Sequence, residues 1–146
     1  MIVVPESKKI EILLIEDDAG DIEIIRHSFE SSSVPTHVSI ARDGEEALCF
    51  LRKKEQYAEA KRPDLILLDL NLPKKDGREL LDTIKQDPVL KIIPVIVITN
   101  SLEDRDVIMS YVLHANAYIV KPLQHEKFLA ALTEIQNFWL KTVMLP

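Results

Sequence analysis

The sequence predicts an α/β fold in which a parallel sheet lies between two layers of helices. Three observations support this prediction. Short apolar segments alternate with segments of helical spacing, the central apolar segments have no polar face, and acidic or polar residues follow the ends of the apolar segments. Strict alternation of strands and helices favours a doubly wound (βα)5 arrangement, because each helical crossover returns the chain parallel to the preceding strand.

The expected strands are five short runs rich in aliphatic and β-branched residues. They cover residues 10–15, 36–41, 64–68, 93–98 and 117–120. Segments 65–68 and 95–98 show no alternation of polar and apolar residues. A strand of this kind is buried on both faces, which is typical of a parallel sheet covered by helices on each side.

Five helices are expected from apolar residues that recur at helical spacing between the strands. Their apolar positions are Ile22, Ile25 and Phe29; Ala47, Leu48 and Leu51; Leu80, Leu81 and Ile84; Val107, Ile108 and Tyr111; and Phe128, Leu132, Ile135 and Trp139. Pro88 is expected to close the third helix, and Ser101 with Asp104 reads as a capping signal at the start of the fourth.

Length and composition limit the possible classes of protein. The 146 residues predict a single domain over 1–146, with a core of about 10–136 and a C-terminal extension at 137–146. One cysteine, no apolar run near the ~20 residues of a membrane span and no signal-like N-terminus together favour a cytoplasmic protein. The net charge of −6 disfavours direct binding to nucleic acid.

Polar residues follow four of the expected strands. Glu16 and Asp17 follow the first strand, Asp69 the third, Thr99 the fourth and Lys121 the fifth. In open doubly wound sheets, ligands bind beyond the carboxyl ends of the strands. The sequence therefore predicts that these side chains gather in one pocket.

The acidic residues of this pocket predict a divalent cation. Two carboxylates about 4 Å apart repel by about 4 kcal/mol at an effective dielectric constant of 20, so a cluster of Glu16, Asp17 and Asp69 calls for a counter-ion. Oxygen ligands suit Mg²⁺, or Mn²⁺ in its place, and the backbone carbonyl of Asn71 adds another oxygen. The chain has no Cys/His cluster with zinc spacing.

The remaining residues of the pocket predict phosphoryl chemistry at Asp69. Lys121 adds a positive charge and Thr99 a hydroxyl donor. With a cation on one side and an ammonium on the other, a phosphoryl group attached to the Asp69 carboxylate would be neutralised. Asp69 is therefore the candidate nucleophile.

Four blocks of sequence resemble the receiver domain of two-component response regulators, of the chemotaxis-regulator kind. They cover residues 12–18, 64–73, 97–101 and 117–122. The resemblance implies a flavodoxin-like sheet in the order 2-1-3-4-5, and a phosphoryl group passed to Asp69 from a phosphohistidine of a histidine kinase.

The same resemblance assigns roles within the pocket. Asp17, Asp69 and the Asn71 carbonyl would bind Mg²⁺ directly, and Glu16 would act through water. The resemblance also makes Thr99 and Tyr118 the switch pair. Lys121 would face the phosphate and precede a cis peptide bond to Pro122.

A narrower resemblance comes from residues 62–79 and from the tail around Phe138, Trp139 and Leu140. These segments are similar to the single-domain regulators that partner bacterial and cyanobacterial phytochrome kinases, which implies a red/far-red light signal and a homodimer. The apolar tail at 138–145 also predicts a dimer contact, since it carries more apolar surface than an exposed terminus favours. Alternatively, the tail folds back on its own domain.

Two residues depart from the receiver pattern. Asn100 stands where receivers usually have alanine or glycine, and its larger amide is expected to slow phosphorylation by small donors or dephosphorylation. His114 stands where receivers often have glycine before the fifth strand. A left-handed backbone at this position is strained for histidine.

Three functions are considered on the basis of the sequence. The first is a signalling protein that is not an enzyme and acts through phosphorylation-dependent binding to an unknown downstream protein. The second is a receiver-like scaffold that signals by binding without phosphorylation. The third is an enzyme. A phosphatase with an aspartyl intermediate is disfavoured because Asn71 replaces a second acid, and a nucleotide-dependent oxidoreductase because no glycine-rich loop is present.

Overall fold

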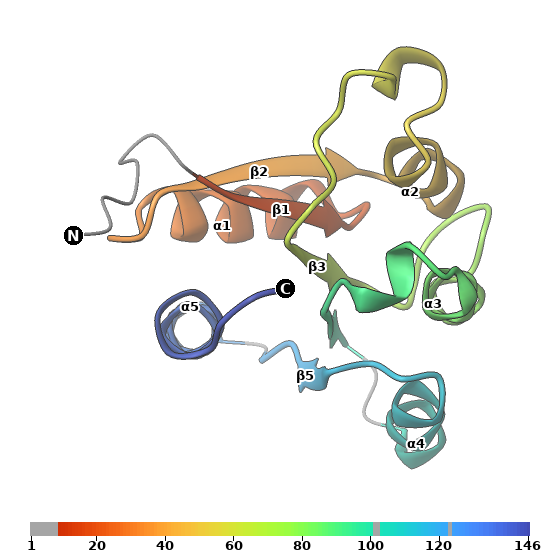
Figure 1. The fold of residues 1–146 in the computed structure, drawn as a ribbon. Helices are drawn as coiled ribbons and strands as arrows, with labels where there is room; N and C mark the ends of the chain where they lie inside the picture. The colour runs from red at the N-terminus through yellow and green to blue at the C-terminus, as the bar shows by residue number, and fades with distance from the viewer. Residues whose placement is uncertain (1–8, 101–102, 123) are drawn as a thin grey trace.

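The computed structural model describes residues 9–100, 103–122 and 124–146. Its parallel sheet has five strands in the order β2-β1-β3-β4-β5 (Figure 1). The strands are β1 Ile10–Ile15, β2 Thr36–Ala41, β3 Leu65–Leu68, β4 Val95–Thr99 and β5 Ala117–Val120. The predicted strand order and the parallel pairing are confirmed.

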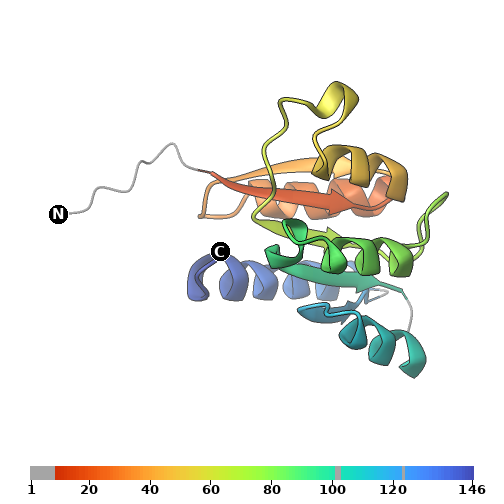
Figure 2. The ribbon, with the colours of Figure 1, turned by 45° about the vertical axis from the view of Figure 1, so that its right-hand side comes forward.

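Five α-helices connect and cover these strands. They are α1 Ala19–Glu30, α2 Gly44–Leu51, α3 Gly77–Gln86, α4 Asp104–Val112 and α5 His125–Gln136. Helices α1 and α5 lie on one face of the sheet, and α2, α3 and α4 lie on the other (Figures 1 and 2). The molecule is therefore the three-layer α/β sandwich that the alternating pattern predicts.

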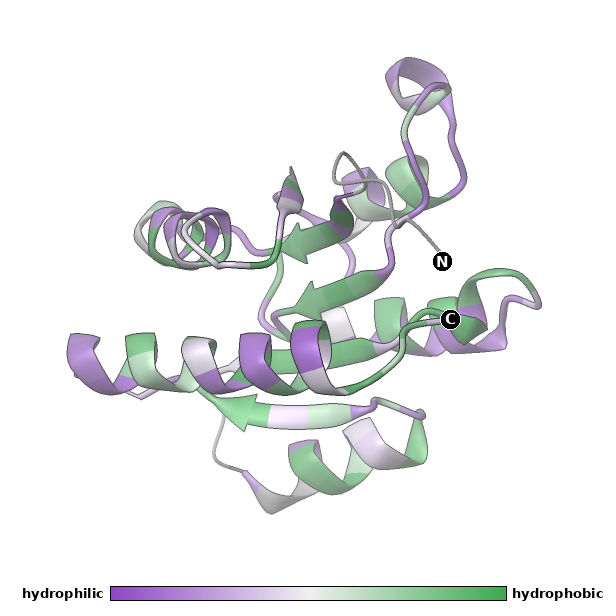
Figure 3. Cartoon of the chain, turned by 60° about the vertical axis from the view of Figure 1, so that its left-hand side comes forward, coloured by the Kyte–Doolittle hydropathy of each residue, from purple (hydrophilic) through white to green (hydrophobic). Residues whose placement is uncertain are grey.

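Both faces of the sheet carry an apolar core. Leu13 and Ile15 of β1 point into the cluster on the side of α2 and α3, whereas Ile12 and Leu14 point into the cluster on the side of α1 and α5. All four residues of β3 are fully buried. Figure 3 shows the strands coloured mostly as hydrophobic, while the helices carry both colours. Burial on both faces explains why the central strands lack polar alternation.

Acidic caps begin three of the helices directly after the loops that follow strands. The carboxylate of Asp18 accepts a hydrogen bond from the Asp21 N–H at 2.8 Å, and Asp43 accepts one from the Glu46 N–H at 2.8 Å. Asp76 caps α3 in the same way, through the Arg78 N–H at 2.7 Å. These caps satisfy N–H groups that the helices leave unpaired. For α4, the predicted cap residue Ser101 lies outside the described residues.

Two strands begin later than the sequence predicts. β3 starts at Leu65, because the Asp64 carboxylate instead accepts a hydrogen bond from the Glu11 N–H at 2.9 Å. β4 starts at Val95, because Leu90–Ile92 forms a short 3₁₀ helix and Pro94 has no N–H to donate to the sheet. A second 3₁₀ helix, Glu55–Tyr57, lies in the connection between α2 and β3.

The C-terminal extension continues α5 as a π-helical segment over Asn137–Thr142. Leu140 is buried in the core beneath α1 and α5, and Trp139 packs partly against the same core. Phe138 and Met144 are exposed. The tail thus folds back on its own domain in part and leaves two large apolar side chains in solvent. None of the helices in the described part of the chain is long and apolar enough to cross a membrane.

Two backbone expectations have different outcomes. His114 adopts a φ of 71°, the left-handed conformation that the sequence position predicts. The predicted cis bond between Lys121 and Pro122 is wrong, since none of the described residues has a cis peptide bond. The trans isomer is the lower-energy form of an X–Pro bond by about 0.5–1 kcal/mol.

An ion pair on the far side of the sheet from α1 and α5 joins α3 to α4. The Arg78 guanidinium donates to both carboxylate oxygens of Asp106, from Nε at 2.9 Å and from an Nη at 2.8 Å. Asp106 is buried, and its hydrogen bond to Arg78 raises the pKa of the guanidinium above its ordinary value. This two-point contact fixes the first turns of both helices beside the carboxyl edge of the sheet.

Replacing Arg78 by methionine is expected to lower the free energy of unfolding by about 1–3 kcal/mol, because a buried carboxylate loses two charged hydrogen bonds. Urea denaturation measures this change. Arg26→Met is the matched control, since Arg26 forms an exposed i,i+3 pair with Glu23 and its loss should cost less than about 0.5 kcal/mol. Equal effects of the two substitutions would contradict this role of the α3–α4 pair.

Candidate functional site

The carboxyl ends of β1, β3 and β5 and the first turn of α1 surround a pocket of about 380 Å³. It is lined by Glu16, Asp17, Asp18, Asp21, Asp69, Asn71, Asn100, Lys121, Pro122 and Phe128. The predicted acids and the predicted lysine therefore do meet in one place, whereas Thr99, which was predicted to join them, is not among the lining residues. Each of the predicted acids, like the lysine, follows a strand whose apolar residues pack into the two cores.

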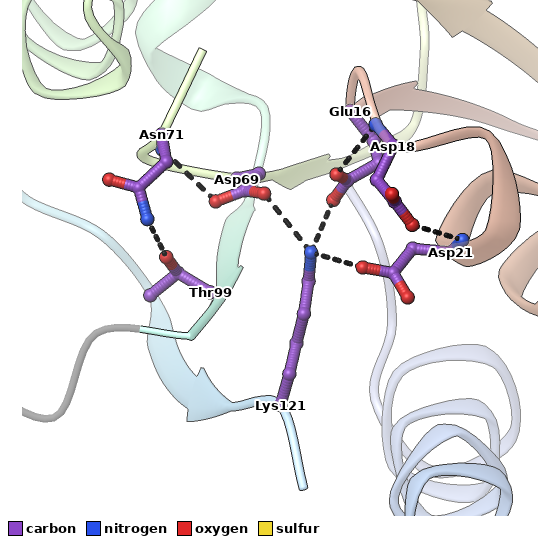
Figure 4. Close-up of polar contacts among 7 residues, drawn as sticks. All are labelled: Glu16, Asp18, Asp21, Asp69, Asn71, Thr99 and Lys121. Carbon is purple, nitrogen blue, oxygen red and sulfur yellow. Dashed lines mark hydrogen bonds and ion pairs between the residues drawn. The ribbon is translucent and has the colours of Figure 1, made fainter. Parts of the chain in front are cut away.

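Lys121 lies at the centre of the pocket and contacts three carboxylates. Its Nζ donates to Glu16 Oε2 at 2.7 Å, to Asp21 Oδ2 at 2.8 Å and to Asp69 Oδ2 at 3.0 Å (Figure 4). Glu16, Asp69 and Lys121 are all nearly inaccessible to solvent, at 1%, 5% and 6% exposure. Buried charges of this kind are stable only when they are paired.

The charges in the pocket perturb one another. Burial by itself lowers the pKa of the Lys121 ammonium, but its hydrogen bonds to Asp21 and Glu16 outweigh burial and the pKa lies above its ordinary value. Burial raises the pKa of the Glu16 carboxyl to about 7, with the Lys121 hydrogen bond opposing the shift and the Asp69 charge adding to it. One lysine does not balance so many acids.

Three acids are placed to hold one cation. Glu16, Asp17 and Asp69 each offer a ligand atom, and these atoms lie within 4.8 Å of one another. Asp17 is exposed, so a bound ion would keep water on that side. Oxygen ligands with retained water fit Mg²⁺ or Mn²⁺. The predicted divalent cation is thus supported by the donor set, while ligation by the Asn71 carbonyl stays a prediction.

Asn71 links the acid of β3 to the hydroxyl of β4. Its N–H donates to Asp69 Oδ1 at 3.0 Å, and its side-chain amide donates to Thr99 Oγ1 at a long 3.5 Å (Figure 4). Thr99 is fully buried. Asp69 is therefore held from both sides, by a backbone N–H on one oxygen and by the Lys121 ammonium on the other.

The two residues predicted to act as a switch lie on adjacent strands. Thr99 ends β4, and Tyr118 is half-buried in β5 and packs against the core on the side of α2 and α3. In the register of the two strands, Tyr118 is opposite Val97 and Thr99 is opposite Val120. Their switching role stays a prediction, as does the effect of Asn100, which lines the pocket.

Asp21 is a pocket residue that sequence reasoning missed. It lies in the first turn of α1, three residues after the capping Asp18, and its carboxylate reaches back over the end of β1 to Lys121. A signal was available, because side chains of a helix tilt toward its N-terminus, and this N-terminus starts at the carboxyl edge of the sheet. The sequence alone does not say which first-turn acid points inward.

A comparison with protein families identifies the family of this fold. The family model of the response regulator receiver domain matches residues 12–133, which run from β1 into α5. The chain belongs to the response regulator receiver family. As a receiver it is a signalling protein with the acidic cluster and the sheet order expected of that family.

Individual relatives cover nearly the whole receiver. The chain is 47% identical to response regulator Rcp1 of Synechocystis sp. over 135 residues, which are 92% of each protein. A probable methanogenesis regulatory protein, FilR2 of Methanothrix harundinacea, is 40% identical over 88% of this chain and 83% of its own length.

Solved structures agree with this assignment. The crystal structure of the phosphorylated cyanobacterial phytochrome response regulator RcpA superposes with a TM-score of 0.92 at 48% identity, covering 95% of this chain and 99% of RcpA. The Mn²⁺-bound form of Rcp1 superposes with a TM-score of 0.91 at 46% identity, covering 93% and 98%. The receiver fold is therefore shared along nearly its full length.

Proposed function

We propose that this receiver is a phosphorylation switch in which Asp69 accepts a phosphoryl group from a phosphohistidine of a histidine kinase. The observation that carries the proposal is the contact of 3.0 Å between Lys121 Nζ and Asp69 Oδ2, beside the three-acid cluster. A nucleophilic carboxylate flanked by an ammonium and a cation site has the charge compensation that phosphoryl transfer requires.

The step transfers one phosphoryl group. An oxygen of Asp69 forms a bond to phosphorus while the bond from phosphorus to the kinase histidine nitrogen breaks, and the electron pair stays on that nitrogen. Asp17, Asp69 and the Asn71 carbonyl would hold Mg²⁺, with Glu16 acting through water. When bound, the cation neutralises charge on the phosphoryl oxygens. Lys121 and the Thr99 hydroxyl take the remaining oxygens.

Signalling would follow from a shift of the Thr99 and Tyr118 pair. The dianionic phosphoryl group attracts the Thr99 hydroxyl, and Tyr118 moves into the space that Thr99 leaves. Such a movement biases an existing two-state equilibrium of α4, β5 and α5, and that face then binds a downstream protein. Thr99 and Tyr118 belong to the adjacent strands β4 and β5, so the movement of Thr99 would have to pass only from one strand to the next.

The kinase is proposed to be a phytochrome, which works in the cytoplasm. The support is the likeness to RcpA, described as a cyanobacterial phytochrome response regulator, and to the bacteriophytochrome response regulator AtBRR, at 39% identity and a TM-score of 0.72. The input would then be red or far-red light.

Asp69→Asn is expected to abolish phosphoryl transfer, because the amide cannot act as the nucleophile. The measurement incubates the variant and the wild-type chain with an autophosphorylated phytochrome kinase and Mg²⁺, and follows loss of label from the kinase. Asp76→Asn is the control, since Asp76 caps α3 and is not among the residues that line the pocket. Transfer to Asp69→Asn at the wild-type rate would rule out Asp69 as the acceptor.

Exposed apolar residues on α4 support a homodimer. Ile108 and Val112 are 63% and 62% exposed, and Met109 and Tyr111 are about half exposed. The tail adds the exposed Phe138. Side chains of this size gathered on one helix are typical of an interface. We therefore propose that two receivers associate through α4 and its neighbours.

Ile108→Asp is expected to convert the dimer to a monomer in analytical ultracentrifugation, because it places a charge in the centre of the apolar face. Phe138→Ser, made separately, distinguishes a contact through the tail. Both substitutions leave the buried Leu140 in place, whereas truncation of the tail would remove part of the core. A wild-type chain that sediments as a monomer at all concentrations would contradict the homodimer.

A further inference from the structure

Asp21 is the carboxylate of the Lys121 group that the receiver function does not yet use. Its Oδ2 atom accepts a hydrogen bond from Lys121 Nζ at 2.8 Å, between the 2.7 Å contact of Glu16 and the 3.0 Å contact of Asp69. It belongs to α1, whereas the phosphoacceptor follows β3 (Figure 4). The lysine is therefore shared between the helix and the sheet.

The donors of Lys121 are fully used in this arrangement. An ammonium group has three N–H donors, and three carboxylates accept from it. A phosphoryl group on Asp69 needs at least one of these donors. One of the three carboxylates must therefore lose its hydrogen bond to Lys121 when the phosphoryl group binds.

A cation weakens two of these three contacts but not the third. Glu16 and Asp69 are members of the acid group whose ligand atoms converge within 4.8 Å, so a bound cation draws on the charge of both carboxylates. Asp21 is not a member of that group. A bound cation therefore leaves the Asp21 carboxylate as a competitor for the ammonium.

We propose that Asp21 is a positioning residue that competes with the phosphoryl group for the Lys121 ammonium, and so limits how tightly a tetrahedral anion is held on Asp69. This inference rests on the proposed phosphorylation of Asp69. The negative charge of Asp21 also weakens the binding of an anion on Asp69. The Oδ2 atoms of Asp21 and Asp69 accept from the same nitrogen and are therefore less than about 6 Å apart. Two anionic groups at this separation repel.

The size of the effect is limited by solvent. The Asp21 side chain is 24% exposed, whereas Lys121 and Asp69 are almost fully buried, so water screens part of the Asp21 charge. We expect removal of this charge to strengthen the binding of a phosphoryl-like anion about tenfold. This change in affinity lies between the changes expected for a fully buried charge and for a fully exposed one.

Binding of beryllofluoride, a tetrahedral mimic of the phosphoryl group, tests this proposal. ¹⁹F NMR titrations compare the wild-type chain with Asp21→Asn, at Mg²⁺ concentrations shown to be saturating for each. The substitution removes the charge but keeps the shape and the acceptor oxygen. Asp21→Asn is expected to bind beryllofluoride about tenfold more tightly. Damage to the fold cannot produce such a gain, so it separates competition from a merely structural role.

Glu23→Gln is the matched control, because Glu23 lies on the same helix, is 65% exposed and pairs with Arg26. The affinity of Glu23→Gln for beryllofluoride should stay within about twofold of the wild-type value. If the wild-type chain binds the anion and Asp21→Asn binds it equally or more weakly, the competition is overturned while the phosphorylation site stands. If the wild-type chain binds no beryllofluoride with Mg²⁺, the assignment of Asp69 as phosphoacceptor fails, and this inference fails with it.

Discussion

Lys121→Met should lower the free energy of unfolding by about 3 kcal/mol when divalent cations are removed by a chelator. The substitution leaves the buried carboxylates of Glu16 and Asp69 facing each other without the ammonium that joins them at 2.7 and 3.0 Å. Removal of one partner from a buried ion pair costs more than the pair itself contributes, because the remaining charge is unpaired. Urea denaturation in the presence of a chelator measures the loss.

Mg²⁺ should restore much of this stability. A divalent cation supplies the positive charge that the variant lacks, so the stabilisation by Mg²⁺ should be larger for Lys121→Met than for the wild-type chain. Lys127→Met is the control, because Lys127 is exposed on α5. If Mg²⁺ stabilises Lys121→Met no more than the wild-type chain, the lysine and the cation do not serve the same group of acids.

Gly77→Ala should have the second large effect, because it is expected to displace Asp69. A Cβ atom at Gly77 would lie 2.5 Å from the Leu70 Cα and 2.6 Å from the Asp69 carbonyl oxygen, which is too close for any real contact. The clash is with backbone, so the segment after β3 must move. We expect a loss of about 1–3 kcal/mol in the free energy of unfolding together with weaker Mg²⁺ binding.

Gly20→Ala provides the comparison for this effect. Gly20 is also in the first turn of a helix beside the pocket, but a Cβ atom there would meet Asp18 Oδ2 at an ordinary 3.4 Å. Alanine favours the helix over glycine by about 1 kcal/mol, so this variant should be as stable as the wild-type chain or more so. Calorimetric titration with Mg²⁺ and thermal unfolding measure both variants. Unchanged Mg²⁺ affinity in Gly77→Ala would show that Asp69 is not positioned through this contact.

Much of the fold follows from local sequence patterns. The strands at β1, β2 and β5 have the predicted bounds, because β-branched and aliphatic runs with clear polar ends have few other structures open to them. The expected start of β4 at residue 93 is two residues too early, since the apolar Ile93 caps the end of the 3₁₀ helix and does not belong to the sheet. Apolar character alone does not separate these two structures.

The site was predictable where it depends on strand ends and less so elsewhere. The meeting of Glu16, Asp17, Asp69 and Lys121 follows from parallel strands that share one edge. The role of Asp21 does not, because it depends on the direction of α1 relative to the sheet. The tail is a similar case. Leu140 is buried against this domain whereas Phe138 is exposed, and the apolar character of the two residues alone does not tell which of them is buried.

The most direct test of the site is a crystal structure of the chain grown with Mn²⁺, with the ion located by its anomalous scattering. The arrangement of the acids predicts a single strong peak at the carboxyl edge of the sheet, within ligand distance of Asp17 and Asp69 and in the same pocket as the Lys121 ammonium. A peak at another part of the molecule, or none in this pocket at saturating Mn²⁺, would contradict the cation site on which the proposed phosphoryl transfer depends.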